Sequence, residues 1–499
     1  MTLRRVLIAN RGEIAVRLIK ACREAGIESV AVYSDADRAA LHVRRADRAV
    51  RIGPASPAES YLSIPALIAA AQETQADAVH PGYGFLSERA GFARACEATG
   101  IMFIGPPADV IERMGSKIAS RALMQSANVP IVPGQTPTDQ SDEGVTEAAR
   151  TIGYPVLVKA SAGGGGKGMR MVRRDADARD AVQAARREAV AAFGDGTLYV
   201  ERLIERPRHI EIQVLADSHG NVVHLFEREC SLQRRHQKVI EESPSAALAA
   251  SVRTRMGEAA VAAARAARYR SAGTIEFLVE GEGDTARFYF LEMNTRLQVE
   301  HPVTEEVTGL DLVRAQFAVA AGEQLPWQQS DLLQRGHAIE CRIYAEDPAN
   351  GFLPQAGPLL LYREPSGPGL RVDSGFGEGD SIAVHYDPLI AKLIAHAETR
   401  EAAIDRAAAA LRRFPILGIR TNTAFLLRLL DDEAFRAGRA HTGYIDEHLE
   451  RLTAEASAPV EAVAAAAIAQ APGSRAAAVR GETPAGALDP WSTLNGWGR

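Results

Sequence analysis

Two carboxylates within one predicted β-hairpin have the spacing of a metal site. The stretch 273–296, GTIEFLVEGEGDTARFYFLEMNTR, reads as two strands around the turn signal EGEGD. If the hairpin is symmetric about Asp284, Glu276 faces Glu292, and Asn294 lies two residues on, on the same face as Glu292. Facing carboxylates in an apolar hairpin repel each other unless a cation lies between them. Oxygen ligands alone favour Mg²⁺ or Mn²⁺, with nucleotide phosphates completing the shell. The alternative is a pair of solvated sheet residues, which the flanking Ile, Phe and Leu disfavour.

A run of glycines separates two predicted strands, PVLVKAS (155–161) and MRMV (169–172), and its members are Gly163, Gly164, Gly165 and Gly166. The run matches GxGxxG, but a dinucleotide fingerprint must open a helix, and a Walker A loop would need Gly at position 161. A strand–loop–strand hairpin remains, flanked by Lys159 and Lys167. Glycines let backbone amides approach an anion, and the two ammonium groups would neutralise phosphate charge. The loop therefore predicts phosphate binding, with a plain flexible hairpin as the alternative.

Two polar segments offer further candidates. In ERECSLQRRHQKVIEE (227–242), His236 and Lys238 lie two apart, although such a charged stretch is as compatible with a solvated face as with a site. In TRLQVEHPVTE (295–305), an extended backbone would place Arg296, Gln298 and Glu300 on one face, as an anion clamp, a hydrogen-bonding group and a carboxylate base. Weaker single signals are His209, Arg342 and the pair Tyr386–Asp387.

The pattern of strands and helices that must position these residues predicts a fold of α/β and α+β type. A β-α-β rhythm over the first 105 or so residues indicates a doubly wound parallel sheet, and the middle block reads as antiparallel hairpins with Ala-rich helices. The third block mixes short strands with helices, and the last residues are rich in Ala, Pro and Gly. The predicted parts are residues 1–115, 116–330, 331–449 and a flexible linker or tail over 450–499.

Length and composition limit the classes of protein to which this chain can belong. A chain of 499 residues exceeds the size of a single core, so several domains are expected. A net charge of −6 argues against a general nucleic-acid-binding face, and no apolar run is long enough to cross a membrane. The four cysteines are scattered and form no CxxC pair, so the sequence gives no sign of a disulfide framework or a zinc ribbon. The expected location is the reducing cytoplasm, without nucleic acid or membrane as partner.

The motifs together resemble one family. LIANRGEIAVR, HPGYGFLSE, MGSK, VKASAGGGGKGMR, RRHQKVIEE and LEMNTRLQVEHPVTE occur in this order and spacing over about residues 1–448. This combination closely resembles the biotin carboxylase component of biotin-dependent carboxylases. The resemblance implies an ATP-grasp fold with a Rossmann-like N-terminal domain, a central ATP-grasp domain whose glycine-rich lid covers about 131–203, and a C-terminal α+β domain.

The resemblance also implies a role for each matching position. Those implied to bind ATP, besides the glycine loop, are Lys117, Lys159, Glu201, Leu203, Ile204, His209, Gln233 and His236. Those implied to hold Mg²⁺ are Glu276, Glu292 and Asn294. Those implied to bind bicarbonate are Lys238, Arg296, Gln298 and Val299. Glu300 would deprotonate the bicarbonate, and Arg342 would stabilise the biotin enolate.

The implied activity is ATP-dependent carboxylation of biotin by bicarbonate through carboxyphosphate. No AMKM-like acceptor motif occurs, so we expect the biotin carrier domain elsewhere and no covalent biotin on this chain. The ending DPWSTLNGWGR is similar to the segment after the carboxylase region in α subunits of methylcrotonyl- and geranyl-CoA-type carboxylases. We therefore expect a truncated α subunit, a carboxyltransferase β subunit as partner, and a homo-oligomer or a place in a hetero-oligomer.

Two other readings stay open. A carbamoyl phosphate synthetase half would share the lysines and carboxylates, but not the RRHQK and TRLQVEHP context. A catalytically silent nucleotide sensor on the same fold is the second, and the intact Glu300, Arg296 and Lys238 argue against it.

Overall fold

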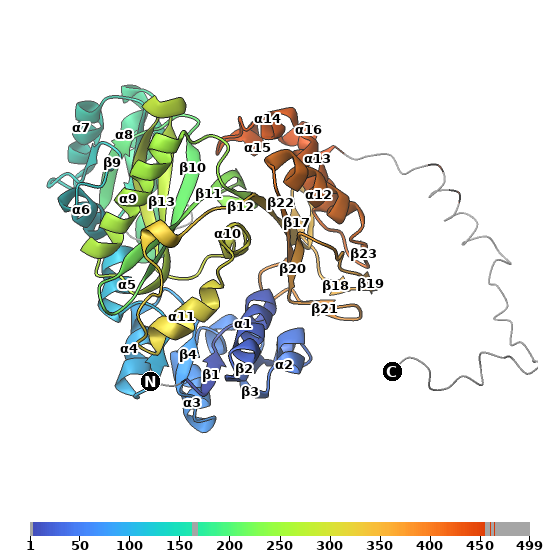
Figure 1. The fold of residues 1–499 in the computed structure, drawn as a ribbon. Helices are drawn as coiled ribbons and strands as arrows, with labels where there is room; N and C mark the ends of the chain where they lie inside the picture. The colour runs from blue at the N-terminus through green and yellow to red at the C-terminus, as the bar shows by residue number, and fades with distance from the viewer. Residues whose placement is uncertain (1–2, 162–167, 455–459, 461–463, 465–499) are drawn as a thin grey trace, which may run out of the picture. The chain divides into compact units, whose positions relative to one another are not determined.

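The N-terminal part of the computed structural model is a parallel sheet with helices on both faces (Figure 1). Its strand order is β3 (Arg48–Gly53), β2 (Glu28–Ser34), β1 (Arg5–Ile8), β4 (Ala78–His80) and β5 (Met102–Phe103). Alternate residues of β1 point to opposite faces, where Val6 packs with α1 (Gly12–Glu24) and Leu7 with α3 (Ile64–Glu73) and α4 (Ala90–Ala98). The predicted doubly wound parallel sheet is confirmed, with the exposed, charged strand β3 in addition.

A small second sheet carries the strands that flank the glycine run. Its order is β6 (Gly134–Gln135), β9 (Leu198–Arg202), β7 (Val156–Ala160) and β8 (Met169–Val172). β7 and β8 pair antiparallel, which confirms the predicted strand–loop–strand hairpin. Helices α7 (Asp142–Ile152) and α8 (Ala178–Phe193) share an apolar core with it. The structure describes residues 3–161, 168–454, 460 and 464, so the predicted phosphate-binding glycines, Gly163 to Gly166, lie outside the described residues.

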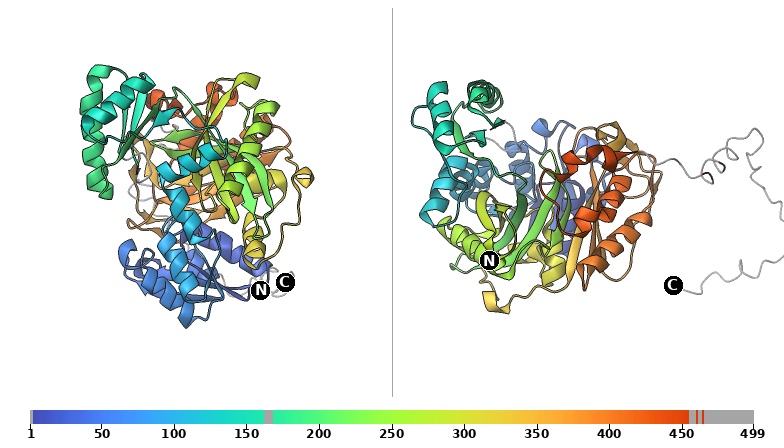
Figure 2. Two further views of the ribbon diagram at one scale, coloured as in Figure 1. Left: turned by 90° about the vertical axis from the view of Figure 1, so that its left-hand side faces the viewer. Right: turned by 90° about the horizontal axis from the view of Figure 1, so that it is seen from above.

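An eight-stranded sheet joins the predicted middle and third blocks. Its order is β14 (Arg287–Asn294), β13 (Ser271–Glu280), β10 (Arg208–Ala216), β11 (Val222–Arg234), β12 (Gln237–Ser243), β15 (His337–Tyr344), β22 (Leu389–Ala397) and β20 (Leu370–Ser374). Because β12 pairs antiparallel with β15, the sheet continues across residue 330. α9 (Ala250–Ala266) covers β10 and β11, and α12 (Arg400–Arg412) covers β15 and β22, as two views show (Figure 2).

The remaining elements connect these sheets. The other helices are α2 (Leu41–Arg45), α5 (Ala108–Gly115), α6 (Lys117–Ser126), α10 (His301–Thr308), α11 (Leu312–Ala320), α13 (Thr423–Asp431), α14 (Glu433–Arg436), α15 (Tyr444–Glu447) and α16 (Leu449–Thr453). The short strands are β16 (Glu346–Asp347), β17 (Leu353–Pro354), β18 (Gly357–Pro358), β19 (Leu361–Tyr362), β21 (Ser381–Ile382) and β23 (Ile416–Leu417). Within the described part of the chain, no helix has the length and apolar character that a membrane span requires.

Candidate functional site

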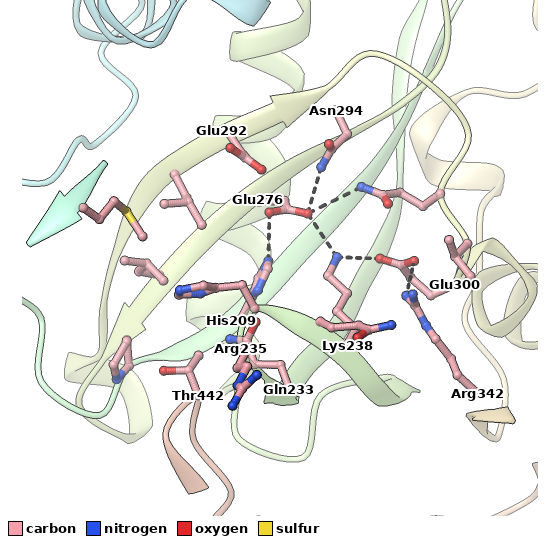
Figure 3. A pocket seen from close by; sticks show the side chains of 18 of the residues that line it. His209, Gln233, Arg235, Lys238, Glu276, Glu292, Asn294, Glu300, Arg342 and Thr442 are labelled. Carbon is pink, nitrogen blue, oxygen red and sulfur yellow. Dashed lines mark hydrogen bonds and ion pairs between the residues drawn. The ribbon is translucent and has the colours of Figure 1, made fainter. Parts of the chain in front are cut away.

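One cavity, of about 1780 Å³, gathers the predicted site residues. It lies among the three sheets, and every predicted site residue within the described ranges lines it: Lys117, Lys159, Glu201, Leu203, Ile204, His209, Gln233, His236, Lys238, Glu276, Glu292, Asn294, Arg296, Gln298, Val299, Glu300 and Arg342. Figure 3 shows the part around Glu276 and Glu300. Segments more than two hundred residues apart in the sequence therefore converge on one space.

The β13–β14 hairpin brings the two predicted metal ligands face to face. Next to the turn the strands pair so that Phe277 lies opposite Phe290, and in that register Glu276 would meet Leu291. A one-residue bulge between these pairs shifts the register, and Glu276 then lies opposite Glu292. The predicted facing pair is confirmed, but simple symmetry about Asp284 is wrong, because the bulge and not the turn sets this register.

The facing carboxylates suit a hard divalent cation. Burial and the charge of Glu276 raise the pKa of Glu292, and a cation beside the pair would favour the ionised form of Glu292. Asn294 lies beside them and donates from Nδ2 to Glu276 Oε1 at 2.8 Å. Rotation of this amide would present its oxygen instead, which would complete an all-oxygen donor set of the kind that Mg²⁺ prefers.

Lys238 connects carboxylates from two strands and a turn. From β12 its Nζ donates to Glu211 Oε2 at 2.6 Å, to Glu276 Oε1 at 3.0 Å and to Glu300 Oε1 at 2.5 Å. Although burial alone would raise the pKa of Glu276, Lys238 and His209 hold that pKa well below the usual value. Glu276 is therefore an anion in the folded protein, as a metal ligand must be.

Glu300 is clamped between two cations and has no exposed surface. Its Oε2 accepts a hydrogen bond from Arg342 Nη2 at 2.9 Å, while Lys238 holds Oε1 (Figure 3). Arg342 is held in turn by Glu241, which accepts from its Nε at 2.5 Å. Burial alone would raise the pKa of Glu300, but Lys238 and Arg342 lower it well below the usual value. The carboxylate is ionised and its orientation is fixed.

The segment that carries Glu300 is not extended, so that prediction is wrong. Residues 295–300 form an irregular turn, and α10 begins directly after Glu300. Arg296 and Glu300 consequently have different partners: Arg296 contacts Asn294, Gln298 and, through Nε at 3.1 Å, Glu88. The turn still brings these side chains to the same cavity. A continued strand would lead the chain away from the cavity, whereas this turn places both its main chain and its side chains at the cavity wall.

A second group of cations lies at the end of the cavity next to the small sheet. Lys117 is the first residue of α6, after the N-cap Ser116, and burial together with the nearby Lys159 lowers its pKa. Lys159 on β7 forms an ion pair with Glu201 on β9. His209 on β10 lies with Nε2 at 3.1 Å from Glu276 Oε2, so it connects this group to the carboxylate pair. Such an array suits a polyanion with a bound cation.

Sequence reasoning missed the groups that hold these side chains in place. Arg228 is fully buried and donates to Glu211 Oε1 at 2.5 Å and to Thr304 Oγ1 at 3.0 Å, while Glu241 holds Arg342. One available signal was the alternation along β10, where His209, Glu211 and Gln213 interrupt an otherwise apolar strand at every second position. Polar groups on one face of a buried strand need partners, which indicates a polar network there.

Known proteins match this chain over almost all of its described length. Three family models match in succession: Biotin carboxylase, N-terminal domain, at residues 2–111; Carbamoyl-phosphate synthase L chain, ATP binding domain, at 116–328; and Biotin carboxylase C-terminal domain, at 340–447. The biotin carboxylase of Halalkalibacterium halodurans is 52% identical over 450 residues, which cover 90% of this chain and 99% of that protein.

A mammalian subunit and a solved structure show the same relationship. The mitochondrial methylcrotonoyl-CoA carboxylase subunit alpha of Rattus norvegicus is 51% identical over 90% of this chain, but the chain spans only 62% of that subunit's length. The biotin carboxylase domain dimer of the Hydrogenobacter thermophilus 2-oxoglutarate carboxylase, in complex with MgADP, ADP and bicarbonate, superposes with a TM-score of 0.87 at 46% identity, covering 92% of this chain and all of that one. The three sheets and their shared cavity are thus those of an ATP-grasp enzyme, and the chain belongs to the biotin carboxylase family of ATP-dependent ligases.

Proposed function

We propose that this chain uses ATP to activate bicarbonate as carboxyphosphate and transfers the carboxyl group to biotin. The observation that carries the proposal is Glu300, an ionised, fully buried carboxylate between Lys238 and Arg342, in the same cavity as the facing pair Glu276 and Glu292. The solved relative in complex with MgADP and bicarbonate supports the choice of substrates.

The first chemical step needs a base, because bicarbonate is a weak nucleophile. Both oxygens of Glu300 are held by cations, so an incoming bicarbonate has to draw Lys238 towards itself and free Oε1 as proton acceptor. Arg296 and Gln298 lie next to this position and can hold the anion. Glu300 would then remove the proton as the bicarbonate oxygen attacks the γ-phosphoryl group of ATP.

The phosphoryl group carries charge that the site must neutralise during transfer. Lys117 and Lys159 supply two ammonium groups on the cavity wall. A divalent ion held by Glu276, Glu292 and Asn294 would add further positive charge at the phosphate oxygens. The glycine run that follows β7 would place backbone amides near these oxygens, as the flanking lysine suggests.

In the next step carboxyphosphate releases CO₂ and phosphate, and phosphate removes the ureido proton of biotin. The enolate that forms then attacks CO₂, and the Arg342 guanidinium, which faces the cavity, would stabilise its negative charge. Burial of Glu300 keeps water away from the labile intermediate on that side.

The wider assembly belongs to the same proposal. The matched α subunit supports a biotin carrier on another part of the assembly, a carboxyltransferase β subunit and an acyl-CoA as final acceptor, within an oligomer. The matched ranges support domain boundaries near residues 115, 330 and 449. The separate small sheet of β6, β9, β7 and β8 supports a lid over about 131–203. The four buried free cysteines suit a reducing compartment such as the cytoplasm.

The test is phosphate release from ATP with bicarbonate and free biotin added separately and together. The proposed enzyme releases phosphate only when bicarbonate is present, releases more when biotin is added, and forms carboxybiotin. Bicarbonate-dependent ATP cleavage that biotin does not stimulate would favour the carbamoyl phosphate synthetase class, whose ATP-binding domain gives its name to the family model that matches the central part of this chain. If the chain does not turn over ATP under any of these conditions, the result would favour a catalytically silent nucleotide sensor.

A further inference from the structure

Lys392 is a fully buried lysine that the mechanism above does not use. It lies on β22, directly opposite Arg342 of β15 in the antiparallel ladder, so the two cations point from the same face of the sheet. That face is the one against which α10 packs. A buried ammonium group is unfavourable unless it is paired, so the groups that Lys392 contacts indicate its role.

The principal contact of Lys392 is with the main chain of the turn before α10. Its Nζ donates to the carbonyl oxygen of Val299 at 2.7 Å. Arg342, its neighbour across the ladder, holds the side chain of Glu300. Two adjacent cations therefore fix one short segment, one through the Glu300 carboxylate and the other through the peptide group that joins Val299 to Glu300.

The irregular turn needs such an anchor. Residues 295–300 belong to no strand or helix, so no ladder of backbone hydrogen bonds sets the direction of this peptide. A rotation about ψ of Val299 that turned this carbonyl away would also move the Cα of Glu300 and carry its carboxylate away from Lys238 and Arg342. A charged donor to a carbonyl oxygen is stronger than a neutral one, and it opposes that rotation.

The same ammonium group also contacts the N-terminal part of the chain. Lys392 Nζ lies 3.3 Å from Glu13 Oε1, and that carboxylate accepts a hydrogen bond from the Tyr83 hydroxyl. Glu13 and Tyr83 line the cavity on the side of the parallel sheet. Through this one ammonium group, Lys392 therefore joins the turn at Glu300 to the cavity wall that the N-terminal part of the chain forms.

We propose that Lys392 is a positioning residue for the proposed base: by holding the Val299 carbonyl it fixes the peptide from which Glu300 projects, and it ties this peptide to Glu13 and Tyr83. The inference rests on the proposed function, because it assigns Lys392 to the bicarbonate step of that reaction. It predicts that Lys392 affects the use of bicarbonate and not the binding of ATP, whose proposed lysines, Lys117 and Lys159, lie on α6 and β7.

The test compares Lys392→Met with the unchanged chain. Methionine has nearly the length of lysine but cannot donate to the carbonyl. Initial rates of phosphate release are measured against bicarbonate at saturating ATP, and against ATP at saturating bicarbonate. Since a displacement of about 1 Å can reduce a rate about 10²-fold, kcat/KM for bicarbonate should fall by about that factor while KM for ATP stays unchanged. A purely structural role would only reduce the apparent kcat in proportion to the folded fraction, so the rate per folded molecule would equal that of the unchanged chain at every bicarbonate concentration.

Two further variants separate positioning from the loss of a buried charge. Arg400→Met is the control, because Arg400 is a largely buried cation that contacts Glu242 and two carbonyls of α14 instead of the turn. It should lower the melting temperature and leave kcat/KM for bicarbonate unchanged. In Lys392→Met/Glu13→Gln the unpaired carboxylate is removed as well, so this protein should fold and still show the bicarbonate defect.

The outcomes distinguish the two proposals. If the unchanged chain shows no bicarbonate-dependent ATP cleavage, the proposed function is wrong. If that chain is active, and the folded Lys392→Met protein or the double variant uses bicarbonate normally, the positioning role is wrong. The role is equally wrong if KM for ATP and KM for bicarbonate rise together, or if Arg400→Met reproduces the bicarbonate defect.

Discussion

Replacing Glu300 by Gln should abolish most of the bicarbonate-dependent ATP cleavage without unfolding the protein. The substitution keeps the volume of the side chain and removes the proton acceptor. A positioned general base contributes about 10²- to 10⁴-fold to a rate. At about 1.36 kcal/mol for each factor of ten, the barrier should rise by about 2.7 to 5.4 kcal/mol.

The charges around Glu300 explain why the fold should survive. The connected cluster holds four carboxylates and three cations, namely Glu211, Glu241, Glu276 and Glu300 with Arg228, Lys238 and Arg342. In the variant Lys238 keeps two carboxylates and Arg342 keeps one. The loss in unfolding free energy should therefore stay below the roughly 3 to 5 kcal/mol of a buried pair broken outright.

The pH dependence gives the prediction a second check. The pKa of Glu300 is lowered, so its contribution to stability is present above the unfolded pKa and is lost as the pH falls through the folded value. At neutral pH the base is fully ionised, and the rate deficit of Glu300→Gln should be constant between about pH 6 and pH 9. Phosphate release across this range measures the rate deficit, and thermal melting below about pH 5 measures the loss of stability. A folded variant that retains more than about a tenth of the rate would refute the assignment of the base.

Three further predictions follow from neighbouring groups. Glu292→Gln removes one of the facing carboxylates, so ATP cleavage should need more Mg²⁺; an unchanged Mg²⁺ titration would contradict the metal site. Arg342→Ala should reduce carboxybiotin formation more than bicarbonate-dependent ATP cleavage, and equal losses in the two assays would contradict its role at the enolate step. Glu340 lies opposite Glu241 and near Lys392, Arg342 and Glu300, and burial raises its pKa. Its contribution to stability is therefore lost as the pH rises, so Glu340→Gln should raise the melting temperature more at about pH 9 than at about pH 6. An equal gain at the two pH values would argue against a protonated Glu340.

The sequence was informative wherever a short-range pattern determines the geometry. The turn signal EGEGD and the period of two in the flanking strands suffice to predict the hairpin, although the bulge at Leu291 sets the register that brings Glu276 opposite Glu292. Likewise, the apolar strands and helices of the first 105 residues suffice for a parallel sheet, because short β-α-β connections leave few alternatives. These predictions depend on neighbours in the sequence, which a reader of the sequence can see.

Features that depend on distant partners could not be predicted in this way. No local pattern marks Leu291 as the site of a bulge, which is seen only in the pairing of β14 with β13. The turn at 295–300 looks extended until the contacts of Val299 with Lys392 and of Glu300 with Arg342 are known. Glu211 and Arg228 pair only after β10 and β11 have formed. Their roles follow from tertiary packing, which overrides the local tendency.

The continuous eight-stranded sheet limits how the gene could be divided. A fragment that stopped near residue 330 would lack β15, β22 and β20, and the edge of β12 would be left with unpaired backbone groups. Leu232, Val239 and Ile240, which pack in the core shared with the C-terminal helices, would become exposed beside that edge. An apolar edge strand is a template for association with other chains. The fragment should therefore aggregate during synthesis, and useful crossover points for chimeric enzymes lie outside this sheet.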